Sequence, residues 1–163
     1  MLLPFWAGAQ VSESDSIQKL VNTARPDTNK VNLLLTLSKS KFNSAPEQAI
    51  QHSAEADSLA RKLKYLKGAA LALKNVGIVY YMQGKYVEAI NTWQESKTMF
   101  DSIGDKPGVA NILSNLGAIY FNQSDAANAL EYYLKALKIA EDLNDSLRIA
   151  TVSMNIGAVY FDK

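Results

Sequence analysis

Apolar side chains recur every three or four positions along most of the chain, which predicts amphipathic helices. A first short helix is expected where four apolar residues follow this spacing: Ile17, Leu20, Val21 and Ala24. Arg25-Pro26 ends this helix, because the residue before a proline is pushed out of the helical conformation.

The rest of the pattern predicts longer helices that alternate as first and second members of pairs. First helices are expected at about 28–43, 67–83, 107–123 and 147–162. Second helices are expected at about 46–64, 86–103 and 126–143. The breaks between them contain turn-forming residues such as Gly84 and Pro107. Because the links are short, consecutive helices should be antiparallel neighbours.

One short segment occurs three times at a spacing of 40 residues: Asn75-Val76-Gly77, Asn115-Leu116-Gly117 and Asn155-Ile156-Gly157. A fixed period of this length is typical of a solenoid, in which each unit buries its apolar surface only against its neighbours. The helix that begins near Asp27 falls in the same register, but Leu35 and Leu37 replace the asparagine and the glycine. It is therefore expected to be a degenerate first copy.

Five positions in each of two units share residue type and spacing. They are Val76, Gly77, Tyr80, Ala89 and Trp93 in one unit, and Leu116, Gly117, Tyr120, Ala129 and Tyr133 in the next. From Asp27 to Lys163 the pattern resembles the tetratricopeptide repeat (TPR) family, in the long-helix variety found in kinesin light chain and in bacterial signalling receptors. Leu73 and Leu113 replace the family's usual tryptophan, and the period exceeds the common value of about 34 residues. The resemblance implies an all-α fold, a right-handed superhelical solenoid of antiparallel helix pairs.

The chain is accordingly divided into three segments. Residues 1–10 resemble the end of a secretory signal, and residues 11–26 form an N-terminal capping helix. The solenoid takes up residues 27–163 as three and a half repeats, at 27–66, 67–106, 107–146 and 147–163. The last unit is expected to lack its second helix, which leaves an apolar strip that self-association could cover.

Gly77, Gly117 and Gly157 fall in the middle of expected helices, where a glycine costs about 1 kcal/mol relative to alanine. We interpret them as points of close approach by the second helix of the pair, with Ala89 and Ala129 as the small residues opposite. Large aromatic side chains of the repeat would fill the wider part of each pair.

A second stripe on the first helices is the candidate binding surface, because the resemblance implies that this stripe lines a concave groove. Its candidate residues are Lys74, Asn75, Ile78, Tyr81, Asn111, Ser114, Asn115, Phe121, Asn122, Asn155 and Phe161. An asparagine offers one acceptor and two donors, which suits holding the backbone of an extended peptide. In the alternative, the asparagines bond to neighbouring helices and the aromatic residues pack between repeats.

Composition argues against several other classes of function. The chain has no cysteine and one histidine, His52, and it contains no phosphate-binding loop, nucleophile motif or metal-ligand spacing. Neither an enzymatic activity nor a metal or other cofactor is expected. With 17 basic and 16 acidic residues the chain has no net field to attract nucleic acid, and no apolar stretch approaches the roughly 20 residues of a membrane span.

Two functions remain after these exclusions, and both make the chain a scaffold that binds a peptide or protein. The first is an input module of a larger bacterial signal-transduction protein, such as a histidine kinase, nucleotide cyclase or regulator. The second is a free-standing adaptor or assembly protein. The small residues Ala7-Gly8-Ala9, which follow a short apolar run, favour export to the periplasm, with a cytoplasmic location as the alternative.

Overall fold

The computed structural model describes residues 13–161, and the expected signal-like segment lies outside this range. The described residues form eight helices and no strand: α1 (Glu13–Thr23), α2 (Thr28–Ser40), α3 (Pro46–Lys62), α4 (Leu66–Met82), α5 (Tyr86–Ser102), α6 (Lys106–Asn122), α7 (Ala126–Asp142) and α8 (Ser146–Phe161). The predicted all-α solenoid is confirmed. Each predicted helix is present, although α2 ends at Ser40 rather than near residue 43.

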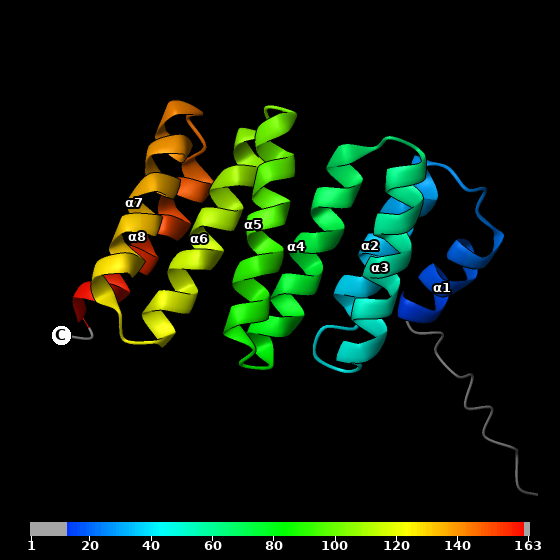
Figure 1. Ribbon diagram of the computed structural model, residues 1–163, viewed down its shortest axis with the longest axis horizontal. Helices are drawn as coiled ribbons and strands as arrows, with labels where there is room; N and C mark the ends of the chain where they lie inside the picture. Colours follow the sequence, from blue (N-terminus) through cyan, green and yellow to red (C-terminus); the bar gives the residue numbers. More distant parts are fainter. Residues whose placement is uncertain (1–12, 162–163) are drawn as a thin grey trace, which may run out of the picture.

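The helices form an elongated two-layer array in which α2, α4, α6 and α8 are the first helices of the pairs and α3, α5 and α7 are the second helices (Figure 1). Each helix packs against the next in the chain, and first helices also contact one another. α1 and α8 lie at opposite ends of the array.

The turns between the helices reveal a backbone period that is shorter than the 40-residue period of the sequence. Each helix from α3 to α7 has 17 residues. The turn after each of them contains one residue in the left-handed conformation: Lys64, Gly84, Gly104, Ser124 and Asn144. These positions are 20 residues apart, so the backbone repeats once per helix and the side chains repeat once per pair. The turns were expected between these helices, but the left-handed backbone at Lys64 and Ser124 was not evident from sequence, since this conformation favours glycine.

Side-chain caps fix the start of four helices. The carboxylates of Asp27, Asp105, Asp125 and Asp145 accept hydrogen bonds from the backbone amides of the residues three positions later. These bonds satisfy amides that have no partner inside the helix. The expected helix start near Asp27 is confirmed, because Asp27 caps α2 directly after the break at Arg25-Pro26.

The glycines in the middle of α4 and α6 make room for aromatic rings rather than for backbone. A Cβ atom at Gly77 would lie 2.2 Å from Nε1 of Trp93, and one at Gly117 would lie 2.7 Å from Cδ1 of Tyr133. The Trp93 indole also donates a hydrogen bond of 3.0 Å to the carbonyl of Lys74. The expectation of close packing at these glycines is correct, but the contacting groups are the rings and not Ala89 or Ala129.

The core is divided into two clusters that meet between the first and second helix pairs. One cluster contains residues of α1 to α4, and the other extends from α4 to α8. Leu71 and Met99 pack against both. We call the contact region of α3, α4 and α5 the first junction, and that of α5, α6 and α7 the second junction.

An arginine ties the first junction together across its two second helices. Arg61 on α3 binds Asp57 of its own helix at 2.8 Å and reaches Glu95 of α5 at 2.9 Å. The same guanidinium lies 4.0 Å from the sulfur of Met99. The second junction has no counterpart of this tie among the interactions of the described residues, and α5 packs on α6 less extensively than α3 packs on α4.

Candidate binding surface

The predicted site residues connect first helices to one another, as a surface formed by α2, α4, α6 and α8 requires. Asn75 donates a hydrogen bond of 3.3 Å to the Leu35 carbonyl on α2. Asn122 on α6 donates to the Tyr81 hydroxyl on α4 at 2.8 Å. Asn155 on α8 donates to the Ser114 hydroxyl on α6 at 3.4 Å.

Burial separates the three asparagines of the repeated segment. Asn75 is 0% exposed, so its amide serves the contact between α4 and α2 and does not face a ligand. Asn75 thus follows the alternative in which the asparagine bonds to a neighbouring helix. Its Oδ1 atom has no partner within the described residues. Asn115 and Asn155 are only partly buried, which leaves them as the accessible part of the expected asparagine row.

The aromatic residues of the stripe divide in the same way. The Tyr81 ring packs 5.9 Å from the Trp93 ring, between centroids, and 6.0 Å from that of Tyr86. Phe121 and Ile78 are partly buried against the core. Phe161 is 94% exposed at the end of α8. The row expected to supply apolar pockets is therefore partly engaged in packing and partly open.

A small polar cavity between α6 and α8 brings two predicted residues together with one that sequence reasoning missed. The cavity has a volume of about 240 Å³, and Asn111, Ser114, Arg148 and Thr151 are among its lining residues. Arg148 donates a hydrogen bond to the Asn111 side chain and pairs with Asp145 at 3.2 Å. Its Nε atom is buried without a partner among the described residues.

The repeat alignment contained a signal for Arg148. The two earlier copies have Gly68 and Gly108 at this position, where a Cβ atom would meet Tyr65 or Phe100 side chains at 2.5 Å or less. An arginine can replace glycine in the last copy only if that space is open. Arg148 therefore breaks an otherwise regular column of the repeat, and it lines the cavity.

Lys74 extends this cationic region toward α2. Burial lowers the pKa of Lys74, and the positive charges of Lys39 and Arg148 lower it further, whereas Asp105 raises it. The charges of Lys39 on α2 and Arg148 on α8 therefore act on Lys74 of α4. A ligand carboxylate would relieve their mutual repulsion, because an opposite charge stabilises the charged form of a buried amine.

The described residues provide no other site with evident chemistry. Among them, no cluster of His, Asp or Glu side chains is close enough to hold a metal ion. Between residues 13 and 161, none of the helices combines the length and apolar character needed to cross a bilayer.

Family models match two parts of the chain. A model described as "Tetratricopeptide repeat" matches residues 108–163, and a second model with the same description matches residues 72–95. No curated protein matches the sequence.

Solved structures with a similar fold cover most of the chain. Aspartyl phosphate phosphatase F from Bacillus subtilis aligns over 91% of this chain and 39% of its own, with a TM-score of 0.82 and 15% identity. BtubC from P. vanneervenii aligns over 91% and 65%, with a TM-score of 0.79 and 21% identity. A Rap protein complexed with competence and sporulation factor aligns over 85% and 39%, with a TM-score of 0.74 and 21% identity.

At these identities the likeness is one of fold. The chain spans between 39% and 65% of the length of these structures.

Proposed function

Because the chain belongs to the tetratricopeptide repeat family, we propose that it acts as a protein-interaction scaffold that binds an extended segment of a partner along the surface formed by α2, α4, α6 and α8. The observation that carries this proposal is the small cavity lined by Asn111 and Arg148, with the charge of Arg148 also acting on Lys74. The solved complex of a Rap protein with competence and sporulation factor supports it, since that protein shares the fold.

The chemistry of this group favours a partner segment that carries a carboxylate. Arg148 lines the cavity, and an arginine guanidinium can bind a carboxylate through two parallel hydrogen bonds. Asn115 and Asn155 lie on the same helices and can bond to the backbone of the segment. We infer that the surface recognises one acidic side chain or a chain end and reads little else of the sequence.

An array of immobilised random peptides of about six residues, incubated with the purified protein, tests this function, because peptides this short do not form the helix that the groove of the second helices would require. Bound peptides should be enriched in Asp and Glu, and Arg148→Ala should abolish that enrichment. Lys62→Ala, which removes an exposed lysine from α3 on the other layer, is the matched control and should leave the bound set unchanged. Enrichment that persists in Arg148→Ala would contradict the assignment of this surface.

We further propose that the scaffold is the input module of a larger signal-transduction protein, exported to the periplasm, and that it has no enzymatic activity of its own. A free-standing adaptor in the cytoplasm is the alternative. Cell fractionation with an antibody against residues of α3 and α5 separates these proposals. A periplasmic signal on a protein much larger than the 17.9 kDa of this chain supports the first, and a cytoplasmic signal at about that mass supports the second.

The exposed face of α8 supports a further proposal, self-association. Leu147, Met154 and Phe161 on this helix are 80%, 75% and 94% exposed. A Cβ atom at Gly157 would meet no described atom within 4 Å, whereas the equivalent glycines of α4 and α6 are covered by aromatic rings. Sedimentation velocity over a range of concentrations tests it. A dimer that Met154→Glu dissociates is expected, and a monomer at all concentrations would contradict it.

A further inference from the structure

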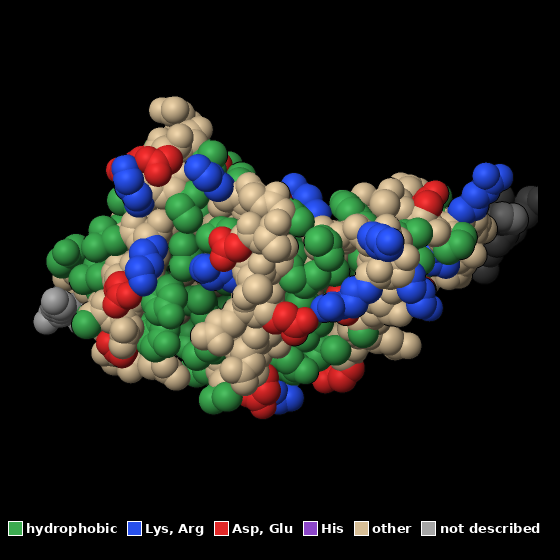
Figure 2. Space-filling view, turned by 45° about the horizontal axis from the view of Figure 1, so that its top comes forward, with side chains coloured by type: hydrophobic (Ala, Val, Ile, Leu, Met, Phe, Trp, Pro, Cys, Tyr) green, Lys and Arg blue, Asp and Glu red, His purple; other side chains and the backbone are tan. Residues whose placement is uncertain are grey.

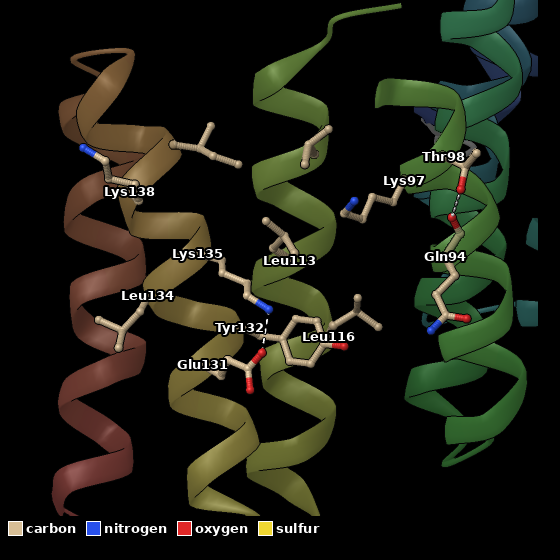
Figure 3. A pocket seen from close by; sticks show the side chains of 12 residues that line it. Gln94, Lys97, Thr98, Leu113, Leu116, Glu131, Tyr132, Leu134, Lys135 and Lys138 are labelled. Atoms are coloured by element: carbon tan, nitrogen blue, oxygen red, sulfur yellow. Dashed lines mark hydrogen bonds and ion pairs between the residues drawn. The ribbon is translucent and has the colours of Figure 1, made fainter. Parts of the chain in front are cut away.

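A large groove opens at the second junction, on the layer formed by the second helices. It has a volume of about 1020 Å³ and lies between α5 and α7, with α6 as its floor (Figure 3). Apolar side chains of α6 form the floor: Val109, Leu113 and Leu116. Ile139 and Tyr132 of α7 form part of one wall. The space-filling view shows hydrophobic side chains gathered in the hollow between α7, at the left, and α5 (Figure 2).

The groove is separate from the surface of α2, α4, α6 and α8 described above. None of the predicted site residues lines it, and neither does Arg148. A groove between two helices with a third as its floor has the shape that accepts an amphipathic helix, which places its apolar face on the floor.

The charged residues that line the groove are mostly basic. Lys97 on α5 and Lys135 and Lys138 on α7 line it, against one carboxylate, Glu131. Each lysine pairs with an acidic residue one turn away on its own helix, at distances between 2.5 and 2.9 Å. Exposed pairs of this kind contribute little to stability. Carboxylates of a partner can therefore replace these acidic residues in pairing with the lysines, with little loss of stability.

We propose that this groove binds an amphipathic helix of a partner protein, with apolar side chains on one face and acidic side chains along its edges. The apolar face packs on Leu113 and Leu116. The acidic edges pair with Lys97 on one side and with Lys135 and Lys138 on the other. The proposal does not depend on the peptide-binding surface, because the two sites share no residue.

A synthetic amphipathic peptide tests the proposal, with leucines on one helical face and glutamates along both edges. The peptide carries a fluorescent label, and binding is followed by fluorescence anisotropy. The wild-type protein should bind it, and the double variant Lys135→Glu/Lys138→Glu should bind it at least tenfold more weakly. The double variant Lys62→Glu/Lys64→Glu makes the same change in net charge outside the groove and should bind like the wild type. A peptide with lysines in place of the glutamates should not bind.

A steric variant tests the apolar part separately. Thr98 lines the groove from α5, and Thr98→Trp should fill it and weaken binding at least tenfold without a change of charge. The matched control is Ser58→Trp, at the equivalent exposed position of α3. Circular dichroism spectra like that of the wild type establish that the variants fold.

Three results would overturn the proposal: no binding of the acidic peptide, equal binding by Thr98→Trp and Ser58→Trp, or equal binding by the two charge variants. Self-association of the wild type that Thr98→Trp abolishes would also overturn it, because the groove would then hold a second copy of this chain. Loss of acidic enrichment on the peptide array in Arg148→Ala concerns the other surface, so failure at one site is distinguishable from failure at the other.

Discussion

The first and second junctions occupy equivalent positions in the repeat, yet Arg61 bridges the second helices of one and a groove lies between those of the other. Positions 40 residues apart reverse their charge between them. Asp57, Arg61 and Glu95 of the first junction correspond to Lys97, Asp101 and Lys135 of the second. The order of charges changes from minus, plus, minus to plus, minus, plus.

After this reversal, neighbouring charges of the triplet still have opposite signs, but the central side chain no longer reaches the next second helix. The Arg61 guanidinium has five donors on a long side chain, so it binds a carboxylate on its own helix and another on the next second helix. Asp101 is short and only accepts hydrogen bonds. It pairs with Lys97 at 2.7 Å, and Lys135 pairs with Glu131 at 2.5 Å, each within one helix. The two second helices are bridged at the junction whose central charged residue, Arg61, is long enough to reach both of them.

A different ion pair links two first helices, α4 and α6, near the second junction. Lys67 on α4 binds Asp105, the cap of α6, at 2.9 Å. The first junction has Tyr65 at the position of Asp105, and its ring lies beside Gly68. Near the second junction, the ion pair therefore joins the starts of the first helices α4 and α6, whereas the groove lies between the second helices α5 and α7.

Both junctions depend on rigidly packed helix pairs, and Gly117→Leu should disrupt the pair of α6 and α7 most severely. The new side chain would collide with the Tyr133 ring, which is 2% exposed and whose burial raises its pKa to about 12. Overpacking of this kind should lower the free energy of unfolding by about 3 kcal/mol or more. Urea denaturation followed by circular dichroism measures the loss.

Gly157→Leu is the matched control, because a Cβ atom there meets no described atom within 4 Å. It should leave stability unchanged or raise it by up to about 1 kcal/mol, since glycine is a poor helix former. Equal destabilisation by both variants would mean that the ring contacts do not hold the pairs together.

Asp105→Ala removes the link at the helix starts of the second junction. It deletes a helix cap and an ion pair to Lys67, so the free energy of unfolding should fall by about 2 kcal/mol. Asp125→Ala removes the cap of α7, and Asp125 forms no ion pair within the described residues. This variant should therefore lower the free energy of unfolding by less. The difference between the two variants in urea denaturation measures the ion pair, and no difference would show that the link is weak.

The same aspartate makes stability depend on acid. Burial alone would raise the pKa of Asp105, but hydrogen bonds from Lys67 and from the Gly108 amide outweigh it and hold the pKa below its usual value. Its contribution is therefore present above the unfolded pKa of about 3.9 and is lost as the pH falls through the folded pKa. Denaturation midpoints between pH 5 and 3 should fall less steeply in Asp105→Ala than in the wild type.

Arg61→Asp gives the first junction the central charge of the second. It removes the bonds to Asp57 and Glu95, and because both side chains of the tie are about half exposed the loss should be about 1 kcal/mol and should shrink in high salt. A double-mutant cycle of Arg61→Ala with Glu95→Ala isolates the pair, because neither substitution introduces a new charge. A coupling energy of zero would mean that the tie follows from the packing and does not cause it.

The sequence predicted the helices and their pairing because apolar spacing and turn residues are local properties. It did not predict that Asn75 is buried, since this depends on the Leu35 carbonyl of another helix. It also missed Arg148 and the groove, although the alignment of copies contained both signals: an arginine in a glycine column, and a reversed triplet of charges. Features of one helix could be read directly, whereas features between helices required the copies to be compared for their differences.

The smallest expected effect comes from installing the charges of the first junction in the second, with Asp101→Arg and Lys135→Glu. The new arginine can reach the new glutamate across the groove, as Arg61 reaches Glu95. The melting temperature should hardly change, because the pair is exposed. The groove should narrow, and the acidic amphipathic peptide should no longer bind.

Spin labels measure the narrowing directly, since the chain has no cysteine of its own. Cysteines at Val87 and Ala127 report the second junction, and cysteines at Glu47 and Val87 report the first, because the three positions are equivalent and exposed. Pulsed electron spin resonance should give a shorter and narrower distance for the second junction in the charge variant. If the distance stays that of the wild type, side-chain reach does not decide which junction opens. The remaining cause is then the shape of Val109 and Leu116, where the first junction has Ala69 and Val76.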